Sequence, residues 1–206
     1  MPKPKVLVVG AGGHAAACID IIEEENKYKI IGLIGMPSEI GQKLSGYEVI
    51  GTDENLKQLL KLTDKIILGI GQIKSPSLRI DITNKFINIG FKFQSTVSPS
   101  SRVSKNTNIG IGSVIMHNTT ISTGSVIGDY SIINTGTIIE HDSKIGSFTH
   151  ISTGVILNGN TSIGNNTFVG SGTIVKEQIN IGHNCIVGMG QQVRHDLSDN
   201  SKLIGN

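Results

Sequence analysis

The sequence predicts an α/β + β fold in which a small parallel α/β domain is followed by a parallel β-helix. An aliphatic residue recurs at every sixth position through the second half of the chain, whereas the first half alternates strand-like and helix-like segments. The composition agrees, because 26 glycines, no tryptophan and 4% aromatic residues indicate an aliphatic, repetitive core. We therefore expect two domains, at residues 1–96 and 97–206.

The aliphatic series of the second half never slips in register. It consists of Val97, Val103, Ile109, Ile115, Ile121, Ile127, Ile133, Ile139, Ile145, Ile151, Leu157, Ile163, Val169, Val175, Ile181, Val187 and Val193. Four residues after most of these positions stands a small side chain, such as Ser131 or Thr149. A period of six fits a short strand plus a corner, and three such units close one triangular coil. Glycines that directly follow the aliphatic residue, such as Gly128, are expected to give the corners backbone freedom.

The first half reads as alternating strands and helices of a small parallel sheet. The expected strands are 5–9, 30–34 and 65–70, and the expected helices are 14–25, 53–62 with Asp53 as its cap, and 77–89.

A glycine-rich turn, residues 10–15 with the sequence Gly-Ala-Gly-Gly-His-Ala, joins the first strand to the first helix. It comes close to the dinucleotide fingerprint of a Rossmann-like domain, so a nicotinamide enzyme has to be considered. The acid that would bind the ribose is missing, because Ile34 and Gly35 end the second strand and no acid follows before Glu39. The loop is therefore interpreted as a mononucleotide-sized phosphate cradle at a helix start.

Composition and charge exclude several classes of protein. The net charge is +2 with both signs scattered and without a basic cluster, which argues against nucleic-acid binding. Cys18 and Cys185 stand far apart without metal-ligand spacing, so neither a disulfide framework nor a metal site is expected. No apolar run is long enough for a membrane span, and the N-terminal run breaks at Gly10, so a cytoplasmic protein is expected.

Two features together are typical of one protein family: the glycine turn is joined to uninterrupted hexapeptides, and these contain the sequence Ile-Asn-Thr-Gly-Thr-Ile-Ile-Glu-His-Asp at 133–142. The chain resembles the sialic acid O-acetyltransferase and UDP-bacillosamine N-acetyltransferase family of bacterial sugar acetyltransferases over nearly its whole length. The resemblance implies a left-handed β-helix. It also implies transfer of an acetyl group from acetyl-CoA to an amino or hydroxyl group of a sugar or nucleotide sugar in bacterial surface glycan biosynthesis.

The same resemblance assigns the candidate site residues. His141 would be the general base, oriented by Asp142, which is chemically sensible because a free imidazole titrates at about pH 6.5. The acetyl-CoA contacts would be His150, Ser171 and Met189. The substrate contacts would be Gly12, Gly13, His14, Gly71 and Asn134.

A geometric expectation concerns the assembly of the site. In a coil of three hexapeptides, Asn134, His141 and His150 are expected to fall on different faces or corners, so that one prism alone would scatter them. Packing of three prisms side by side would bring a corner of one subunit to a face of the next. We therefore expect a homotrimer with active sites between subunits.

Three alternatives stay open. Family members that bind a UDP-sugar commonly carry paired acids where this chain has Ile34 and Gly35, so the acceptor could instead be a sialic-acid-like nonulosonate that carries no UDP and is acetylated on oxygen. A non-catalytic β-helix scaffold is the second alternative. A nicotinamide enzyme is the third, and the missing acid argues against it.

Overall fold

The structure is a computed structural model that describes residues 2–73 and 75–205, and it divides into two compact units. The first unit contains the residues up to Gly71 together with Ser77–Val97, and the second contains Gln72–Pro76 together with the residues from Ser98 onward. The short segment 72–76 thus belongs with the second half of the chain, although it lies between two elements of the first.

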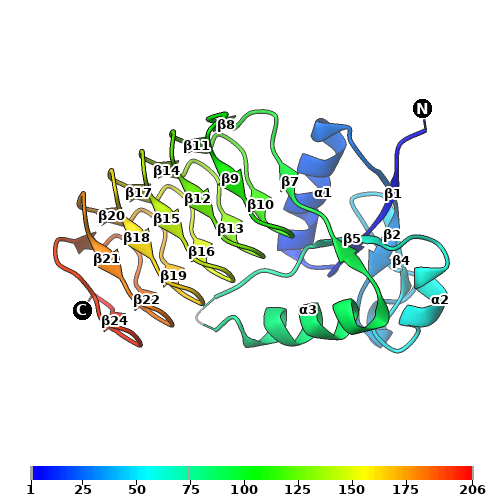
Figure 1. Ribbon diagram of the computed structural model, residues 1–206. Coiled ribbons are helices and arrows are strands. Elements are labelled where there is room, and N and C mark those ends of the chain that lie inside the picture. Colours follow the sequence, from blue (N-terminus) through cyan, green and yellow to red (C-terminus); the bar gives the residue numbers. More distant parts are fainter. Residues whose placement is uncertain (1, 74, 206) are drawn as a thin grey trace. The chain divides into compact units, whose positions relative to one another are not determined.

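The first unit is a parallel sheet covered by helices (Figure 1). The strands of this unit are β1 (Lys5–Val9), β2 (Lys29–Ile34), β3 (Lys43–Leu44), β4 (Tyr47–Gly51), β5 (Lys65–Leu68), β6 (Lys92–Phe93) and the short β7 (Thr96–Val97). The sheet order is β3-β4-β2-β1-β5-β6, and within it only the β3–β4 pair is antiparallel. The helices are α1 (Gly13–Glu25), η1 (Pro37–Glu39), α2 (Leu56–Leu60) and α3 (Ser77–Ile89). None of the helices in the described residues is long and apolar enough to cross a membrane.

The strand predicted at 65–70 ends at Leu68, and the helix predicted at 53–62 differs more from the structure. The helix expected to begin at Asp53 is shorter and starts at Leu56, with Asn55 at the N-cap position. The side chain of Asn55 turns back instead, and its Oδ1 accepts the backbone N–H of Thr52 at 2.9 Å. This local turn occupies the residues that the prediction had given to the first helical turn, so Asp53 is not a helix cap.

The chain reverses its direction across the sheet between β1 and β5. The α1 connection runs from β1 to β2 on one side, whereas the α3 connection runs from β5 to β6 on the other. Right-handed crossovers in opposite directions place α1 and α3 on opposite faces of the sheet. The loops that follow β1 and β5 therefore diverge, which creates a crevice at the carboxyl ends of these two adjacent strands.

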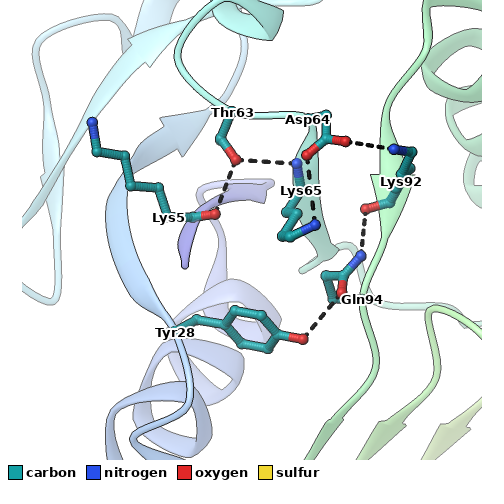
Figure 2. A network of polar contacts seen from close by, with 7 residues as sticks. All are labelled: Lys5, Tyr28, Thr63, Asp64, Lys65, Lys92 and Gln94. Atoms are coloured by element: carbon teal, nitrogen blue, oxygen red, sulfur yellow. Dashed lines mark hydrogen bonds and ion pairs between the residues drawn. The ribbon is translucent and has the colours of Figure 1, made fainter. Parts of the chain in front are cut away.

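A polar network ties the edge strand β6 to the rest of the sheet (Figure 2). Asp64 is its centre, since its carboxylate accepts Lys92 Nζ at 2.8 Å and lies 3.7 Å from Lys65 Nζ. The hydrogen bond from Lys92 is the main reason that the pKa of Asp64 is lowered. Gln94 continues the network by donating to the Lys92 carbonyl and accepting the hydroxyl of Tyr28.

The second unit is a left-handed parallel β-helix built from two-residue strands (Figure 1). Its strands are β8 (Arg102–Val103), β9 (Asn108–Ile109), β10 (Val114–Ile115), β11 (Thr120–Ile121), β12 (Val126–Ile127), β13 (Ile132–Ile133), β14 (Ile138–Ile139), β15 (Lys144–Ile145), β16 (His150–Ile151), β17 (Ile156–Leu157), β18 (Ser162–Ile163), β19 (Phe168–Val169), β20 (Ile174–Val175), β21 (Asn180–Ile181), β22 (Ile186–Val187), β23 (Gln192–Val193) and β24 (Lys202–Leu203). The three walls have the strand orders β24-β22-β19-β16-β13-β10, β23-β20-β17-β14-β11-β8 and β21-β18-β15-β12-β9.

Each strand pairs with the third strand after it, as in Ile133↔Ile151, so one coil consists of three hexapeptides. The predicted aliphatic series lines the interior, and from Ile115 to Val193 each member is at most 3% exposed. The hexapeptide prediction is therefore confirmed.

The small residues that follow one wall, one in every three hexads, form a buried polar ladder along a corner of the prism. Ser131 illustrates the pattern: its Oγ donates to the carbonyl of Gly146 at 2.8 Å and accepts the backbone N–H of Thr149 at 3.3 Å. Ser113, Thr149 and Thr167 make the same contacts one coil apart. A hydroxyl at this position satisfies backbone groups that the corner leaves without a strand partner.

The glycines that follow the aliphatic residues have a different role from the predicted one. Gly110, Gly128, Gly146 and Gly164 do not adopt positive φ angles, but a Cβ on any of them would meet the backbone of the next coil at 2.5–2.6 Å. These glycines permit close stacking rather than unusual dihedral angles. Positive φ angles occur instead at other corners, at residues such as Asn118, Asn160 and Gly136.

We predict that Ile133→Ala lowers the free energy of unfolding by about 2–5 kcal/mol, because Ile133 is fully buried and the neighbouring coils cannot collapse onto the cavity. Denaturant unfolding followed by circular dichroism would measure this change. Ile87→Ala on α3 is the matched control, since Ile87 is 45% exposed and alanine is a better helix former; we expect a change within about 0.5 kcal/mol. Equal losses in the two variants would contradict the assignment of the prism interior as the core.

Candidate functional site

A cavity of about 610 Å³ lies at the carboxyl ends of β1 and β5, where the chain reverses direction. Gly12, Gly13, His14 and Gly71, which the sequence analysis assigned to the substrate, all line it. The two loops are in close contact where they leave the sheet, because a Cβ on Gly10 would lie 2.9 Å from the carbonyl oxygen of Gly69, and they diverge beyond that point. The first residues of α1 line this cavity, and the start of a helix suits an anionic ligand.

Carboxylates also line the cavity, and the sequence analysis did not assign them to it. Glu39 is held in place because its Oε2 accepts the backbone N–H of Met36 at 2.7 Å. Asp53 forms an ion pair of 2.5 Å with Lys85.

A buried arginine supports the second loop from behind. The Arg79 side chain on α3 is 1% exposed and donates from its guanidinium to the carbonyl of Ile70. Burial lowers the pKa of Arg79 to about 10, so the group stays protonated at neutral pH. Burial also raises the pKa of the nearby Cys18 thiol to about 12, an effect that the charge of Arg79 partly offsets. The loop that carries Gly71 is therefore anchored to the interior of the first unit.

In the second unit, His141 and Asp142 form an exposed pair at the corner after β14. His141 Nδ1 lies 2.8 Å from Asp142 Oδ2, and both side chains are more than half exposed. Because the carboxylate accepts the proton of Nδ1, the neutral imidazole keeps an unprotonated Nε2 that can accept another proton. The pair has the arrangement of a general base with an orienting carboxylate.

Glycines flank this pair on the neighbouring coils. A Cβ on Gly159, which lies one coil after His141, would approach His141 Nε2 to 2.6 Å. A Cβ on Gly124, which lies one coil before Asp142, would collide with Asp142 Oδ1. The imidazole and the carboxylate each occupy space that a side chain would otherwise fill. Asp142 itself has a φ of 59°, a left-handed conformation that aspartate tolerates better than most residues.

Asn134 and His150 come together on another wall of the prism. Asn134 follows β13 and His150 begins β16, the adjacent strand, so that Asn134 Nδ2 lies 3.2 Å from His150 Nε2. The expectation that one prism scatters these two residues is wrong. Almost one full coil separates them along the chain, and this spacing returns the chain to the same wall. His141 follows β14 in a different sheet.

The environment of His150 is almost closed. The side chain is 7% exposed and its ring packs edge-on against Phe168, with centroids 5.3 Å apart. Its Nδ1 lies 2.6 Å from the backbone carbonyl oxygen of Gln72. Gln72 also donates from Nε2 to the carbonyl of Phe148 at 3.0 Å.

The remaining candidate residues, Ser171 and Met189, stand on one corner of successive coils. Ser171 is exposed and its Oγ lies 2.9 Å from Ser152 Oγ, while Met189 is 79% exposed. They form an accessible strip, and within the part of the chain that the structure describes neither is hydrogen-bonded to His141. Among residues 2–73 and 75–205, no three His, Cys, Asp or Glu side chains are grouped so that they could hold a metal ion.

The sequence analysis missed the residues that support the candidate side chains. Gly124 and Gly159 could have been found by moving one coil back or forward from the His141–Asp142 pair, once one coil was recognised as the repeat. Gln72 and Arg79 carried no such signal, because their contacts depend on where the chain returns in three dimensions.

Comparison with known proteins identifies what the two units resemble. Residues 5–86 match the family described as the PglD N-terminal domain. A search of curated protein sequences returns no significant match.

Solved structures match both units together. PerB from Caulobacter crescentus, in complex with CoA and GDP-perosamine, is 30% identical, with a TM-score of 0.90 over 98% of this chain and 94% of that chain. A histidine-to-alanine variant of GDP-perosamine N-acetyltransferase from Caulobacter crescentus, with the same two ligands, is 29% identical, with a TM-score of 0.90 over 98% and 93% of the two chains. The acetyltransferase domain of PglB from Neisseria gonorrhoeae FA1090, in complex with acetyl coenzyme A, is 29% identical, with a TM-score of 0.88 over 100% and 98%.

We predict that neither cysteine of the native protein reacts rapidly with Ellman's reagent at pH 8. Cys18 is fully buried with a pKa of about 12, and Cys185 is fully buried with a pKa that desolvation raises, so the reactive thiolate is scarce and covered. Both thiols should react after denaturation. Lys57→Cys on the exposed side of α2 is a positive control that should add one fast thiol. Rapid reaction of two thiols in the native wild-type protein would show that the burial is incorrect.

Proposed function

Because this chain belongs to the hexapeptide-repeat family of bacterial sugar acetyltransferases, we propose that it transfers acetyl from acetyl-CoA to the amino group of a nucleotide-linked amino sugar. The observation that carries the proposal is the His141–Asp142 pair, whose exposed Nε2 is free of the carboxylate and able to accept a proton. The amino group as acceptor is supported by the relatives with GDP-perosamine and CoA bound, and a GDP-linked sugar is the first substrate to test.

His141 acts as the general base in this proposal. Its Nε2 takes a proton from the sugar amine as the amine nitrogen attacks the thioester carbonyl carbon. The new C–N bond forms, the C–S bond breaks, and CoA leaves with its sulfur carrying the released electron pair, to be protonated as the thiol. Asp142 orients the imidazole and favours the imidazolium that forms. The relative crystallised with one histidine replaced by alanine and both ligands bound is consistent with a histidine that matters more for reaction than for binding.

The two domains have separate tasks in the proposal. The domain at residues 1–96 binds the nucleotide sugar, with the phosphates at the glycine loop of Gly12 and Gly13 and contacts from His14 and Gly71. The domain at residues 97–206 binds acetyl-CoA through His150, Ser171 and Met189, and Asn134 contacts the substrate beside His150. Ser171 and Met189 are both accessible on one corner of successive coils, which this assignment requires.

A homotrimer with active sites between subunits is part of the proposal. His141 stands on a different wall from Asn134 and His150, so groups from two prisms are needed to surround one acetyl group. A cytoplasmic location is also part of the proposal, and it is supported by the use of acetyl-CoA and by the two free, buried thiols, which suit a reducing compartment.

We predict that His141→Ala lowers kcat by at least a hundredfold, because a positioned general base contributes about 10²–10⁴ in rate. The measurement is CoA thiol release with acetyl-CoA and a panel of GDP- and UDP-linked amino sugars, free nonulosonates and CMP-nonulosonates. His195→Ala is the matched control, since His195 is exposed on the last coil, and it should keep activity within about twofold. Turnover of a nonulosonate alone would favour O-acetylation, and turnover of none would leave a binding scaffold.

We predict that Gly159→Ala lowers kcat by about tenfold to a hundredfold, because its Cβ would displace His141 Nε2, and small misplacements of a catalytic group have effects of this size. Gly188→Ala is the control within the same β-helix, since its Cβ would meet its nearest neighbours at an ordinary 3.4 Å. Thermal unfolding of both variants separates a local effect from misfolding. Full activity of Gly159→Ala would mean that the His141 ring position is not the one that reacts.

A further inference from the structure

Gln72 makes two hydrogen bonds to one short segment of the β-helix, although it stands far from that segment in the sequence. Its side chain donates from Nε2 to the Phe148 carbonyl at 3.0 Å, and its backbone oxygen accepts from His150 Nδ1 at 2.6 Å. Gln72 is 3% exposed and belongs to the same compact unit as both partners. We propose that Gln72 is a positioning residue that holds His150 as one tautomer and thereby aims the amide of Asn134 at the substrate.

The tautomer of His150 follows from its partners. A backbone carbonyl can only accept, so the hydrogen bond to Gln72 places the ring proton on Nδ1. The Nε2 atom of the neutral ring is then an acceptor, and it faces Asn134 Nδ2 at 3.2 Å. The orientation of the Asn134 amide agrees, because its Oδ1 accepts the backbone N–H of Thr135 at 2.8 Å. Each donor in this series of hydrogen bonds therefore meets an acceptor, and donation runs from Asn134 to His150 and from His150 to the Gln72 carbonyl.

The consequence concerns which group can donate to a ligand. Both nitrogens of His150 are engaged within the protein, so the ring would contact acetyl-CoA through its carbon atoms and offers no N–H to an acetyl or sugar oxygen. Asn134 has two hydrogens on Nδ2 and uses one toward His150, and its side chain is half-buried rather than closed off. The second hydrogen is a donor whose direction is set by His150, and therefore by Gln72. This inference rests on the proposed function, because it assigns a role within the same site.

The burial of Gln72 argues against a purely structural role. Its Oε1 is buried without a hydrogen-bond partner among the described residues. A buried polar atom without a partner costs about 1–3 kcal/mol, which an apolar side chain of the same size would avoid. A glutamine kept at this cost indicates that its Nε2–H is needed.

The segment that Gln72 holds is also under backbone strain. Phe148 adopts a φ of 52°, which is unfavourable for a bulky side chain, and its ring stacks on Tyr130 with centroids 4.8 Å apart. The hydrogen bond from Gln72 Nε2 to the Phe148 carbonyl fixes this corner just before His150. Two contacts from one residue thus determine where the imidazole lies.

The test is a double-mutant cycle on the full-length protein with Gln72→Met and Asn134→Ala, assayed by CoA release. Methionine matches the length of glutamine but removes the Nε2–H donor. We expect Gln72→Met to lower kcat by about tenfold to a hundredfold. The melting temperature should change little, because the loss of the donor to the Phe148 carbonyl is offset by removal of the unpartnered Oε1. The double variant should be no slower than Asn134→Ala alone, because the two residues act through one hydrogen-bond chain. Gln58→Met, on the exposed side of α2, is the matched control and should leave kcat unchanged.

A second measurement does not depend on activity. Nitrogen-15 chemical shifts of the histidine side chains, assigned with a His150→Gln variant, should show a protonated Nδ1 and an unprotonated Nε2 for His150 in the wild type. Gln72→Met keeps the backbone carbonyl of residue 72 but loses the side-chain hydrogen bond to Phe148 that holds this carbonyl against the ring, so we expect a mixture of tautomers in that variant. Multiplicative losses in the double variant, an unchanged kcat for Gln72→Met, or a proton on Nε2 in the wild type would each overturn the proposal. If the wild type releases no CoA from any acceptor, the proposed function fails, and the shifts still decide the tautomer.

Discussion

The close stacking of successive coils is the constraint on which the second unit depends. Parallel strands lie about 4.8 Å apart, so each residue is in contact with the residues one coil before and one coil after it. Where the chain turns, Gly128 and Gly146 leave no room for a Cβ between coils, and Ser131 satisfies the backbone groups of the corner. This stacking makes the prism a rigid lattice in which the position of a side chain is set by its neighbours on two other coils.

The candidate catalytic pair uses this lattice directly. His141 and Asp142 are exposed, and exposed side chains usually sample several rotamers. Here the ring lies over Gly159 on one neighbouring coil and the carboxylate lies over Gly124 on the other, while the two groups hydrogen-bond to each other. The space available on each side therefore limits where they can point, and an accessible base can still be oriented.

In the first unit and at Gln72, the candidate site residues are positioned by loop contacts rather than by the stacking of coils. In the first unit, the reversal of direction between β1 and β5 opens a cavity whose loops are held by close glycine contacts and by the buried Arg79. One residue beyond Gly71, which lines that cavity, Gln72 is hydrogen-bonded to the β-helix. The positive φ of Phe148 recurs at the same corner of neighbouring coils, at Tyr130 and Asn166, whereas the unpartnered Oε1 of Gln72 is a departure from ordinary packing next to His150. Such a departure is common at functional sites, where the chemistry rather than the stability selects the residue.

The sequence by itself determined the β-helix, because a six-residue period is a local property that any window of the second half repeats. It also determined the strand, glycine loop and helix at the start of the chain, and it indicated His141 and Asp142, which are adjacent residues. It did not determine where the short helix begins at Leu56, because the side chain of Asn55 forms a competing turn. It also did not show why a glycine is required at position 128, because the atoms that exclude a Cβ there are backbone atoms of another coil. The meeting of Asn134 and His150 follows from the repeat, because almost one coil separates them, although the sequence analysis did not draw this conclusion. Only the tertiary structure decided that Gln72 holds His150. This contact joins residues of the two halves of the chain, and a hydrogen bond over such a separation leaves no period in the sequence from which it could be predicted.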